Sequence, residues 1–181
     1  MHDILLVIRP SRGSPVLEEI LGKDYKGTVV CDCWRAYDFL GILQRCWSHL
    51  LRRAKEFDWT VAGRHLYKKL KVMFKEIKRF NKRNPTKEER AAKYDKMTEE
   101  LKVTIKYYSR YEELKGLITY IGNNIGNWFT CVKYEGIEPT NNFAEQALRE
   151  TVIVRKIIGA FRSENGNRIM KYWPLCYRLG N

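Results

Sequence analysis

The feature that most constrains the fold is a long, charged, glycine-poor segment from Leu50 to Tyr120, in which apolar residues recur at helical spacing. An apolar stripe at i, i+4, i+7, i+8, i+11 and i+14 consists of Leu66, Leu70, Met73, Phe74, Ile77 and Phe80. Such a stripe predicts an amphipathic helix that packs on one face. A break at residues 81–85 precedes a second helix near Thr86, with the stripe Tyr94, Met97, Leu101 and Ile105. We therefore expect a helical hairpin here.

Basic residues are concentrated in the same segment. Residues 50–120 hold 20 Lys and Arg against 10 Asp and Glu, a difference of +10 within a formal net charge of +13. A chain this basic favours a polyanionic partner, with nucleic acid first and an acidic membrane second. A cationic helix face is in general more often a solvated surface than a binding site, and both interpretations stay open.

Short apolar segments before the hairpin have the length and β-branched content of strands. Residues 3–9 (DILLVIR) and 27–33 (GTVVCDC) are predicted strands, separated by a short helix that starts at Ser14 and ends at Gly22. Residues 34–40 are a predicted short helix, and residues 43–47 are a candidate third strand. With 181 residues and 44 % hydrophobic content, the chain is long enough for one α/β domain with a core.

Membrane, secretion and nucleotide-loop signals are missing from the sequence. No run approaches the roughly 18 apolar residues of a membrane span, and the first ten residues do not resemble a signal peptide. The five cysteines, an odd number, predict reduced thiols rather than a disulfide framework. Neither GxxxxGK[ST] nor GxGxxG occurs. We expect a cytoplasmic protein without a membrane partner.

Two carboxylates, Asp32 and Glu145, occupy positions where a side chain could bind a ligand or a metal ion. Asp32 lies at the carboxyl end of the 27–33 strand, where ligands gather in sheets with helical connections; alternatively, it caps the next helix. Glu145 falls in the first turn of a helix predicted between Pro139 and Gly159. The spacing from Asn142 to Glu145 is also that of a capping box, so a capping role for Glu145 stays open.

The predicted Glu145 helix also carries cations on one stripe. Glu145, Arg149, Val152 and Lys156 recur at i, i+4, i+7 and i+11. A carboxylate with two cations on the same stripe could hold a metal ion at one end and phosphates along the rest.

Four segments of the chain resemble successive blocks of the IS66-type insertion-sequence transposases: VIRPSRGSPVLEEILG, GTVVCDCWRAY, QRCWSHLLRRAKEF and EPTNNFAEQALRETVIVRKIIGAFRSENGNR. The resemblance extends from about residue 4 to about residue 168. Its most specific parts are EPTNNFAEQALR and RKIIGAFRSENG, which occur in that order.

The resemblance implies a DDE-type transposase with an RNase H-like fold, in which two Asp and one Glu bind divalent metal for DNA cleavage and strand transfer. Asp32 falls on the second acidic position and Glu145 on the third, both catalytic and metal-binding, with two Mg²⁺ or Mn²⁺ ions in the complete enzyme. Their separation, 145 − 32 = 113 residues, is consistent with a basic helical insertion at residues 50–125 of an incomplete mixed sheet. The residues expected to contact phosphates are Arg149, Arg155, Lys156 and Arg162.

Further motif residues are Cys46 and His49, in a Cys-x-x-His element found in several DDE groups, and Asn141 and Asn142. The role of Cys46 and His49 cannot be assigned from sequence. An alternative zinc site would use Cys31, Cys33, Cys46 and His49. We do not favour zinc, because CxC spacing is less usual than CxxC and strand alternation would put both thiols opposite Asp32.

The family's first catalytic Asp lies on a strand before the matched part. We therefore expect residues 1–181 to be an N-terminally truncated transposase domain that is inactive alone, with DNA and either further copies or a full-length transposase as partners. The alternative is a non-enzymatic, basic DNA-binding remnant that competes or pairs with full-length transposase.

Overall fold

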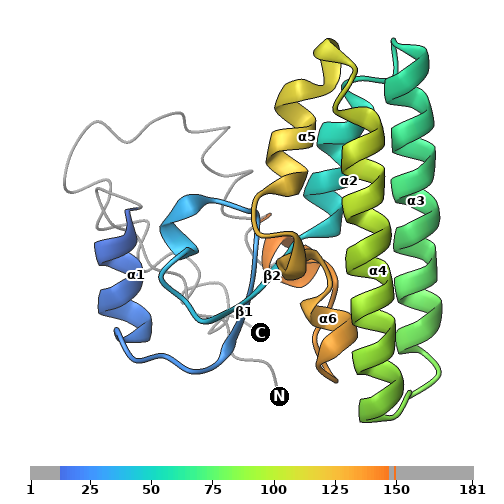
Figure 1. The fold of residues 1–181 in the computed structure, drawn as a ribbon. Helices are drawn as coiled ribbons and strands as arrows, with labels where there is room; N and C mark the ends of the chain where they lie inside the picture. Colours follow the sequence, from blue (N-terminus) through green and yellow to red (C-terminus); the bar gives the residue numbers. More distant parts are fainter. Residues whose placement is uncertain (1–12, 147–148, 150–181) are drawn as a thin grey trace, which may run out of the picture. The chain divides into compact units, whose positions relative to one another are not determined.

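The structure is a computed structural model in which residues 13–146 and residue 149 are described. The chain divides into two compact units, which we treat separately. The larger unit is Leu21–Asn141, and the described residues of the smaller unit are 13–20, 142–146 and 149. The predicted strand at residues 3–9 lies outside the described residues. Figure 1 shows the elements of both units in chain order.

Helix α1 (Ser14–Leu21) forms where the apolar spacing predicted a short amphipathic helix. Gly22 follows it with φ +84°, the left-handed conformation that commonly ends helices and that glycine adopts without a steric penalty.

Strands β1 (Thr28–Cys31) and β2 (Ile42–Arg45) form a two-stranded parallel sheet, paired from Thr28 with Ile42 to Cys31 with Arg45. Both strands are shorter than predicted. The first ends before Asp32, and the second gives way at Cys46 to a helix. Residues 34–40, predicted as a short helix, contain only a 3₁₀ turn, η1 (Arg35–Tyr37). The described part of the chain is thus a mixture of helix and strand that is mostly helical.

The predicted helical hairpin is confirmed. Helix α3 (Val61–Asn81) and helix α4 (Lys87–Tyr108) lie side by side in Figure 1, joined by the break predicted at residues 81–85. Thr86 and Glu89 form a reciprocal capping box at the start of α4, which satisfies backbone donors there. The buried residues of the two stripes are Leu66, Leu70, Met73, Ile77, Met97 and Leu101. No helix among the described residues is long and apolar enough to cross a membrane.

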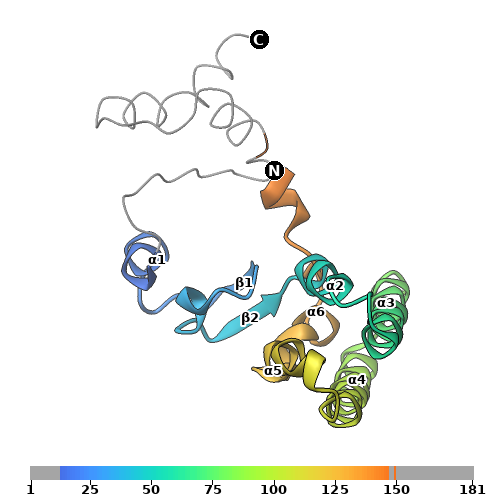
Figure 2. The same cartoon turned by 90° about the horizontal axis from the view of Figure 1, so that it is seen from above.

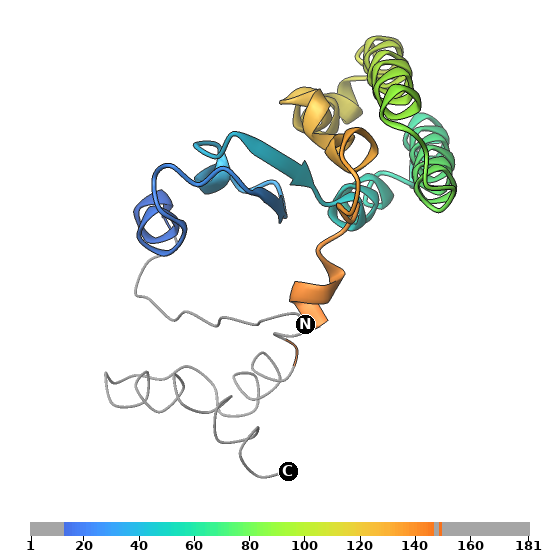
Figure 3. The same ribbon diagram turned by 90° about the horizontal axis from the view of Figure 1, so that it is seen from below.

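Four shorter elements pack between the sheet and the hairpin: α2 (Trp47–Lys55), α5 (Lys115–Gly122), the 3₁₀ helix η3 (Ile125–Trp128) and α6 (Thr130–Lys133). Figures 2 and 3 show α2, α5 and α6 between the two strands and the α3–α4 pair. The core is centred on Trp47, which stacks on Phe74 at 5.8 Å and contacts Trp128 and Phe129 at 6.1 and 5.7 Å between ring centroids. Fully buried aromatic groups of this size dominate the hydrophobic stabilisation of a core.

Buried hydrogen bonds join β2 to this helical layer. The Gln44 side chain is fully buried; its Nε2 donates to the Trp128 carbonyl at 3.2 Å, and its Oε1 accepts from the Cys131 N–H at 2.6 Å. The Thr130 hydroxyl donates to the Leu43 carbonyl. Because unpaired buried polar groups are costly, these bonds set the position of α6 against the strand.

The hairpin is joined to α6 in the same way. The Asn81 side chain donates to the Cys131 carbonyl at 3.0 Å, and the buried Arg90 donates to the Val132 carbonyl at 3.1 Å. The last carbonyls of a helix have no partner within the helix, so these side chains supply one. The larger unit is therefore connected by polar contacts as well as by its core.

Candidate functional site

Asp32 lies one residue beyond the carboxyl end of β1, and its side chain is exposed. Its Oδ1 accepts a hydrogen bond from the Trp34 N–H at 3.3 Å, which stabilises the turn that leaves the strand. Asp32 therefore orders the following turn and still presents a carboxylate to solvent. The sequence left two roles open, a ligand-binding carboxylate at the strand end and a cap of the next helix. The next helix, η1, begins after Trp34 and has no side-chain cap hydrogen bond, so Asp32 orders the turn before it rather than capping it.

The turn after Asp32 is made by a residue in an unusual conformation. Cys33 has φ 73°, in the left-handed region that costs a non-glycine residue about 1–2 kcal/mol. Burial raises the pKa of the Cys33 thiol to about 11, against a lowering effect of a side-chain hydrogen bond with Tyr120. The thiol is therefore protonated near neutral pH and a poor nucleophile. Since Cys33 lies outside the strand, the alternation expected for Cys31 and Cys33 does not extend to it.

Cys46 links the segment that carries Asp32 to the segment that leads to Glu145. Its N–H donates to the carbonyl of Cys31 at 2.8 Å, and its Sγ accepts from the Asn141 N–H at 3.5 Å. Next to it, the Trp47 N–H, one of the first free donors of α2, donates to the Pro139 carbonyl at 3.0 Å. The Cys-x-x-His element and the EPTNN segment are thus in direct contact, while His49 lies half-buried within α2.

The segment that carries Glu145 is helical in its described part, residues 142–146 and 149. Asn141 directly precedes the first helical residue, and Glu145 lies in the first turn, as predicted. Glu145 is half-buried and Arg149 is exposed. The other three residues predicted to contact phosphates, Arg155, Lys156 and Arg162, lie outside the described residues.

The carboxylates suit a hard divalent cation in their chemistry, because Asp and Glu supply oxygen ligands. Asp32 fits one such ligand, since it is exposed and has one oxygen engaged only by a backbone N–H. Asp32 belongs to the larger unit and Glu145 to the smaller, so each is described within its own unit. Within residues 13–146 and 149, no group of three or more His, Cys, Asp or Glu side chains is gathered. That statement includes the four residues of the zinc alternative, Cys31, Cys33, Cys46 and His49.

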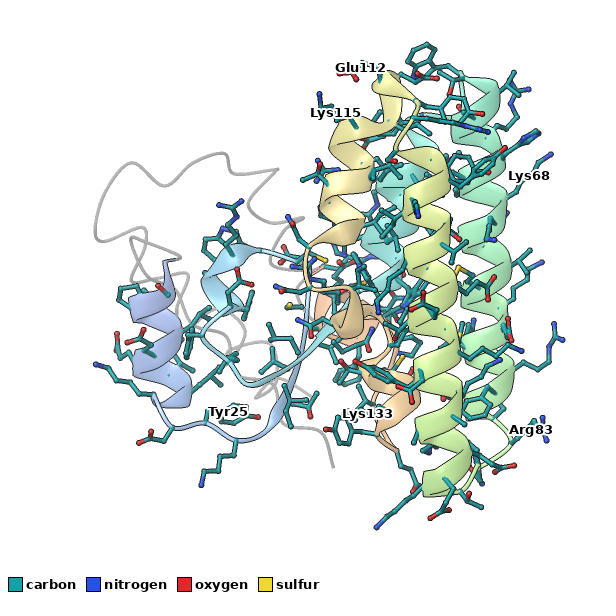
Figure 4. The ribbon with its side chains drawn as sticks, viewed as in Figure 1. Tyr25, Lys68, Arg83, Glu112, Lys115 and Lys133 are labelled. Atoms are coloured by element: carbon teal, nitrogen blue, oxygen red, sulfur yellow. The ribbon has the colours of Figure 1, made fainter. Side chains whose placement is uncertain are left out.

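A basic surface runs along α3, and we call it the α3 basic face. It consists of exposed side chains at spacings of four, three, four, three and four residues: Arg64, Lys68, Lys71, Lys75, Lys78 and Lys82. Glu76 is the one acidic residue within the α3 sequence, whereas α4 carries five acidic residues: Glu88, Glu89, Asp95, Glu99 and Glu100. Figure 4 shows Lys68 on α3, and Arg83 in the connection that follows α3, directed away from the bundle. The basic character predicted for the hairpin is therefore concentrated on one helix.

A second basic feature, which we call the arginine pocket, was not predicted from the sequence. It is a polar cavity of about 600 Å³ in the larger unit, and Arg35, Arg45 and Arg53 line it. These arginines come from η1, from the end of β2 and from α2, and only the fold brings them together. Arg45 and Arg53 lie within the QRCWSHLLRR segment, but their spacing of eight residues has no known meaning as a motif.

Comparison with known proteins gives one match. A family model described as the IS66 family of transposases matches residues 2–169, nearly the whole chain. Comparisons with curated proteins and with solved structures found no match.

Proposed function

The chain belongs to the IS66 family of transposases, which gives it a role in DNA transposition, and we propose that Asp32 and Glu145 serve the phosphodiester chemistry of a DDE transposase. We propose for the domain an RNase H-like fold with the basic helical segment of residues 50–125 as its insertion. The parallel pairing of β1 and β2, with Asp32 at the carboxyl end of β1, supports this assignment.

The observation that carries the proposal is the exposed carboxylate of Asp32, with Cys46 bonded to both flanking segments. Cys46 binds the Cys31 carbonyl just before Asp32 and the Asn141 N–H just before the helix of Glu145. In this arrangement Cys46 is a positioning residue for the two segments. The Trp34 N–H holds Oδ1 of Asp32, and its other oxygen remains available for binding.

Asp32 and Glu145 would hold Mg²⁺ or Mn²⁺, which, when bound, helps activate the attacking oxygen and stabilise the leaving oxygen. Arg149, exposed one turn beyond Glu145, would bind a DNA phosphate, as would Arg155, Lys156 and Arg162. These contacts supply affinity and register rather than sequence recognition.

Mn²⁺ titration followed by NMR tests the assignment without requiring cleavage. Mn²⁺ should broaden the backbone signals of Cys33 and Trp34 in the native protein, and Asp32→Asn should abolish this broadening. Asp38→Asn is a matched control, because Asp38 is also exposed and lies in the same β1–β2 connection. Equal broadening in native protein and Asp32→Asn would contradict the proposal.

A nicking assay with Mg²⁺ or Mn²⁺ addresses the reaction itself. If the chain cleaves DNA, Glu145→Gln and Asp32→Asn should each lower the rate at least about 100-fold, since a lost metal ligand removes most of the charge stabilisation. If Glu145→Gln cleaves DNA as fast as the native protein, Glu145 is not a catalytic metal ligand.

The second candidate function is non-enzymatic DNA binding, and the α3 basic face favours it. The triple variant Lys68→Gln, Lys71→Gln and Lys75→Gln should weaken duplex binding and lower the slope of log K against log salt by roughly 3, near 0.9 per lost phosphate contact. The control is Lys96→Gln, Lys102→Gln and Lys106→Gln, three exposed lysines of α4 with the same change in charge. This function predicts binding that survives Asp32→Asn and Glu145→Gln. Equal slopes for both triple variants would reject α3 as the contact.

The proposed protein partner is a further copy of this chain or a full-length transposase. Exposed apolar side chains at the α2–α3 turn support a protein contact: Trp59 is 71 % exposed and Val61 is 67 % exposed. Analytical ultracentrifugation with and without DNA, comparing native protein with Trp59→Ser, tests self-association. A monomer at all concentrations in both proteins would exclude it.

A further inference from the structure

We infer that the arginine pocket binds a phosphate group. The pocket has a volume of about 600 Å³, within the usual range for small-ligand sites. Arg35, Arg45 and Arg53 line it together with Asp38, Tyr120 and Asn123. All of these residues belong to the larger unit.

Arg45 is the strongest indication of an anionic ligand. Its residue is only 6 % exposed, yet among the described residues it forms no salt bridge with a carboxylate. Its Nη1 donates to the carbonyls of Asn123 and Tyr120 at 2.5 and 3.5 Å, and its guanidinium lies 5.5 Å from the Trp128 ring centroid. Among the described residues, no atom accepts a hydrogen bond from Nε or Nη2 of Arg45. Because a buried charge is costly unless it is paired, an anion in the pocket would complete its coordination.

The other two arginines raise the positive charge of the pocket. The guanidinium of Arg53 stacks on Tyr120 at 4.2 Å, which orders the side chain and leaves its donors free to bind. Arg35 is exposed, and no described carboxylate pairs with Arg35 or Arg53. Asp38 contributes one negative charge, so these lining side chains carry a formal charge of +3 − 1 = +2. Planar guanidinium groups match the oxygens of phosphate well.

The position of the pocket identifies the source of the phosphate as the DNA backbone, a step that rests on the proposed function. Cys33 lines the pocket, and Cys33 directly follows Asp32. A DNA strand whose reacting phosphate lies at Asp32 would place a neighbouring phosphate toward the three arginines. Free inorganic phosphate shares the same chemistry, so the experiment must separate the two sources.

The test is fluorescence anisotropy with a labelled single-stranded oligonucleotide at low salt, without divalent metal. We expect Arg53→Gln and Arg35→Gln each to weaken binding about tenfold, the usual effect of losing a charge-assisted hydrogen bond. Arg52→Gln is the matched control, because Arg52 is the exposed neighbour of Arg53 on α2 and does not line the pocket. It should change affinity less than about twofold, as expected for a screened surface charge.

Two further arms identify the ligand. Inorganic phosphate should shift the NMR signal of the Arg45 Nε–H in native protein and Arg52→Gln, but less in Arg53→Gln. An oligonucleotide with neutral methylphosphonate linkages should bind less tightly than the unmodified one. This loss of affinity should be smaller in Arg53→Gln than in the native protein. If Arg52→Gln and Arg53→Gln weaken oligonucleotide binding equally, or if phosphate does not shift the Arg45 Nε–H signal, phosphate binding in the arginine pocket would be overturned. A phosphate-induced shift without any dependence on backbone charge would overturn the assignment to DNA. Asp32→Asn and Glu145→Gln should leave these results unchanged, so failure of the metal site is a separate outcome.

Discussion

At the residue scale, Cys46 shows how one small side chain can bring separate motifs together. It is fully buried, precedes the first residue of α2, and contacts Cys31 through its N–H and Asn141 through its Sγ. A free thiol in this setting acts as a small apolar group and a weak acceptor. Through these two hydrogen bonds it holds the segments on either side in position.

Cys46→Ala removes the sulfur acceptor and leaves the Trp47–Pro139 hydrogen bond in place. We expect the Asn141 amide to exchange with solvent faster, by at least about fivefold, and the free energy of unfolding to fall by about 1–2 kcal/mol. Hydrogen exchange measured by NMR tests this, and the Trp47 amide is the internal control. Equal acceleration at Asn141 and Trp47 would indicate general loosening and contradict a specific bond.

Cys131 is a second informative residue, because burial raises the pKa of its thiol from 9.0 to about 12. Between these values the unfolded chain loses the proton while the folded chain keeps it. The free energy of unfolding should therefore fall as pH rises above about 9, by up to about 1.4 kcal/mol per pH unit, and should lack this dependence below pH 9. Urea unfolding at pH 8 to 10.5 should show a shallower decline in Cys131→Ala. A decline of equal slope in both proteins would show that Cys131 does not contribute.

At the element scale, the turn between α2 and α3 depends on a close backbone approach. Thr60 caps α3, with its hydroxyl accepting the Gly63 N–H at 2.9 Å. A Cβ on Gly63 would lie 2.0 Å from the Phe57 carbonyl oxygen, which is backbone and cannot move aside easily. Glycine is thus required here by space. The chain can reverse from α2 into α3 because that space is left open.

Gly63→Ala should lower the free energy of unfolding by about 2 kcal/mol or more, as expected for overpacking against backbone. Gly116→Ala is the control, since nothing lies within 4 Å of a Cβ at that helical position. It should raise stability by about 0.5–1 kcal/mol through the lower entropy of the unfolded chain. Thermal or urea unfolding measures both, and equal effects of the two substitutions would refute the close contact at Gly63.

At the scale of the whole molecule, the larger unit contains both basic features and its own core. Trp47, Trp128 and Phe129 are fully buried within it, and Gln44, Asn81 and Arg90 join its elements through backbone groups. A unit with its own core and with buried hydrogen bonds between its elements has the features of an independently folding body.

We therefore expect residues 21–141, produced alone, to unfold cooperatively and to keep the near-ultraviolet circular dichroism of packed tryptophans. Trp47→Ala in this fragment should lower the free energy of unfolding by about 3–5 kcal/mol, because it empties the centre of the core. Trp59→Ala, at a side chain that is 71 % exposed, is the control and should change it by less than about 0.5 kcal/mol. A non-cooperative transition in the unmodified fragment would show that the larger unit depends on the rest of the chain.

Local periodicity was sufficient for the hairpin. The stripes of α3 and α4, the break at residues 81–85 and the start of the second helix near Thr86 depend on contacts between residues close in sequence, so pattern and propensity predict them. The boundaries of β1 and β2 were predicted less well. Cys33 and Cys46 have strand-like neighbours, but one adopts a left-handed turn and the other begins α2. Such ends depend on packing and on distant hydrogen-bond partners, which a local pattern does not contain.

The sequence by itself determined the family, the helical hairpin, the net basic charge, and Asp32 and Glu145 as the acidic candidates. The tertiary structure decided which basic side chains of α3 are exposed, that Cys46 connects the Cys-x-x-His and EPTNN segments, and that three arginines share one pocket. The physical reason is the separation along the chain of the residues that interact. Helical spacing and charge are properties of neighbouring residues, whereas a pocket formed by Arg35, Arg45 and Arg53 exists only once a strand, a turn and a helix have packed together.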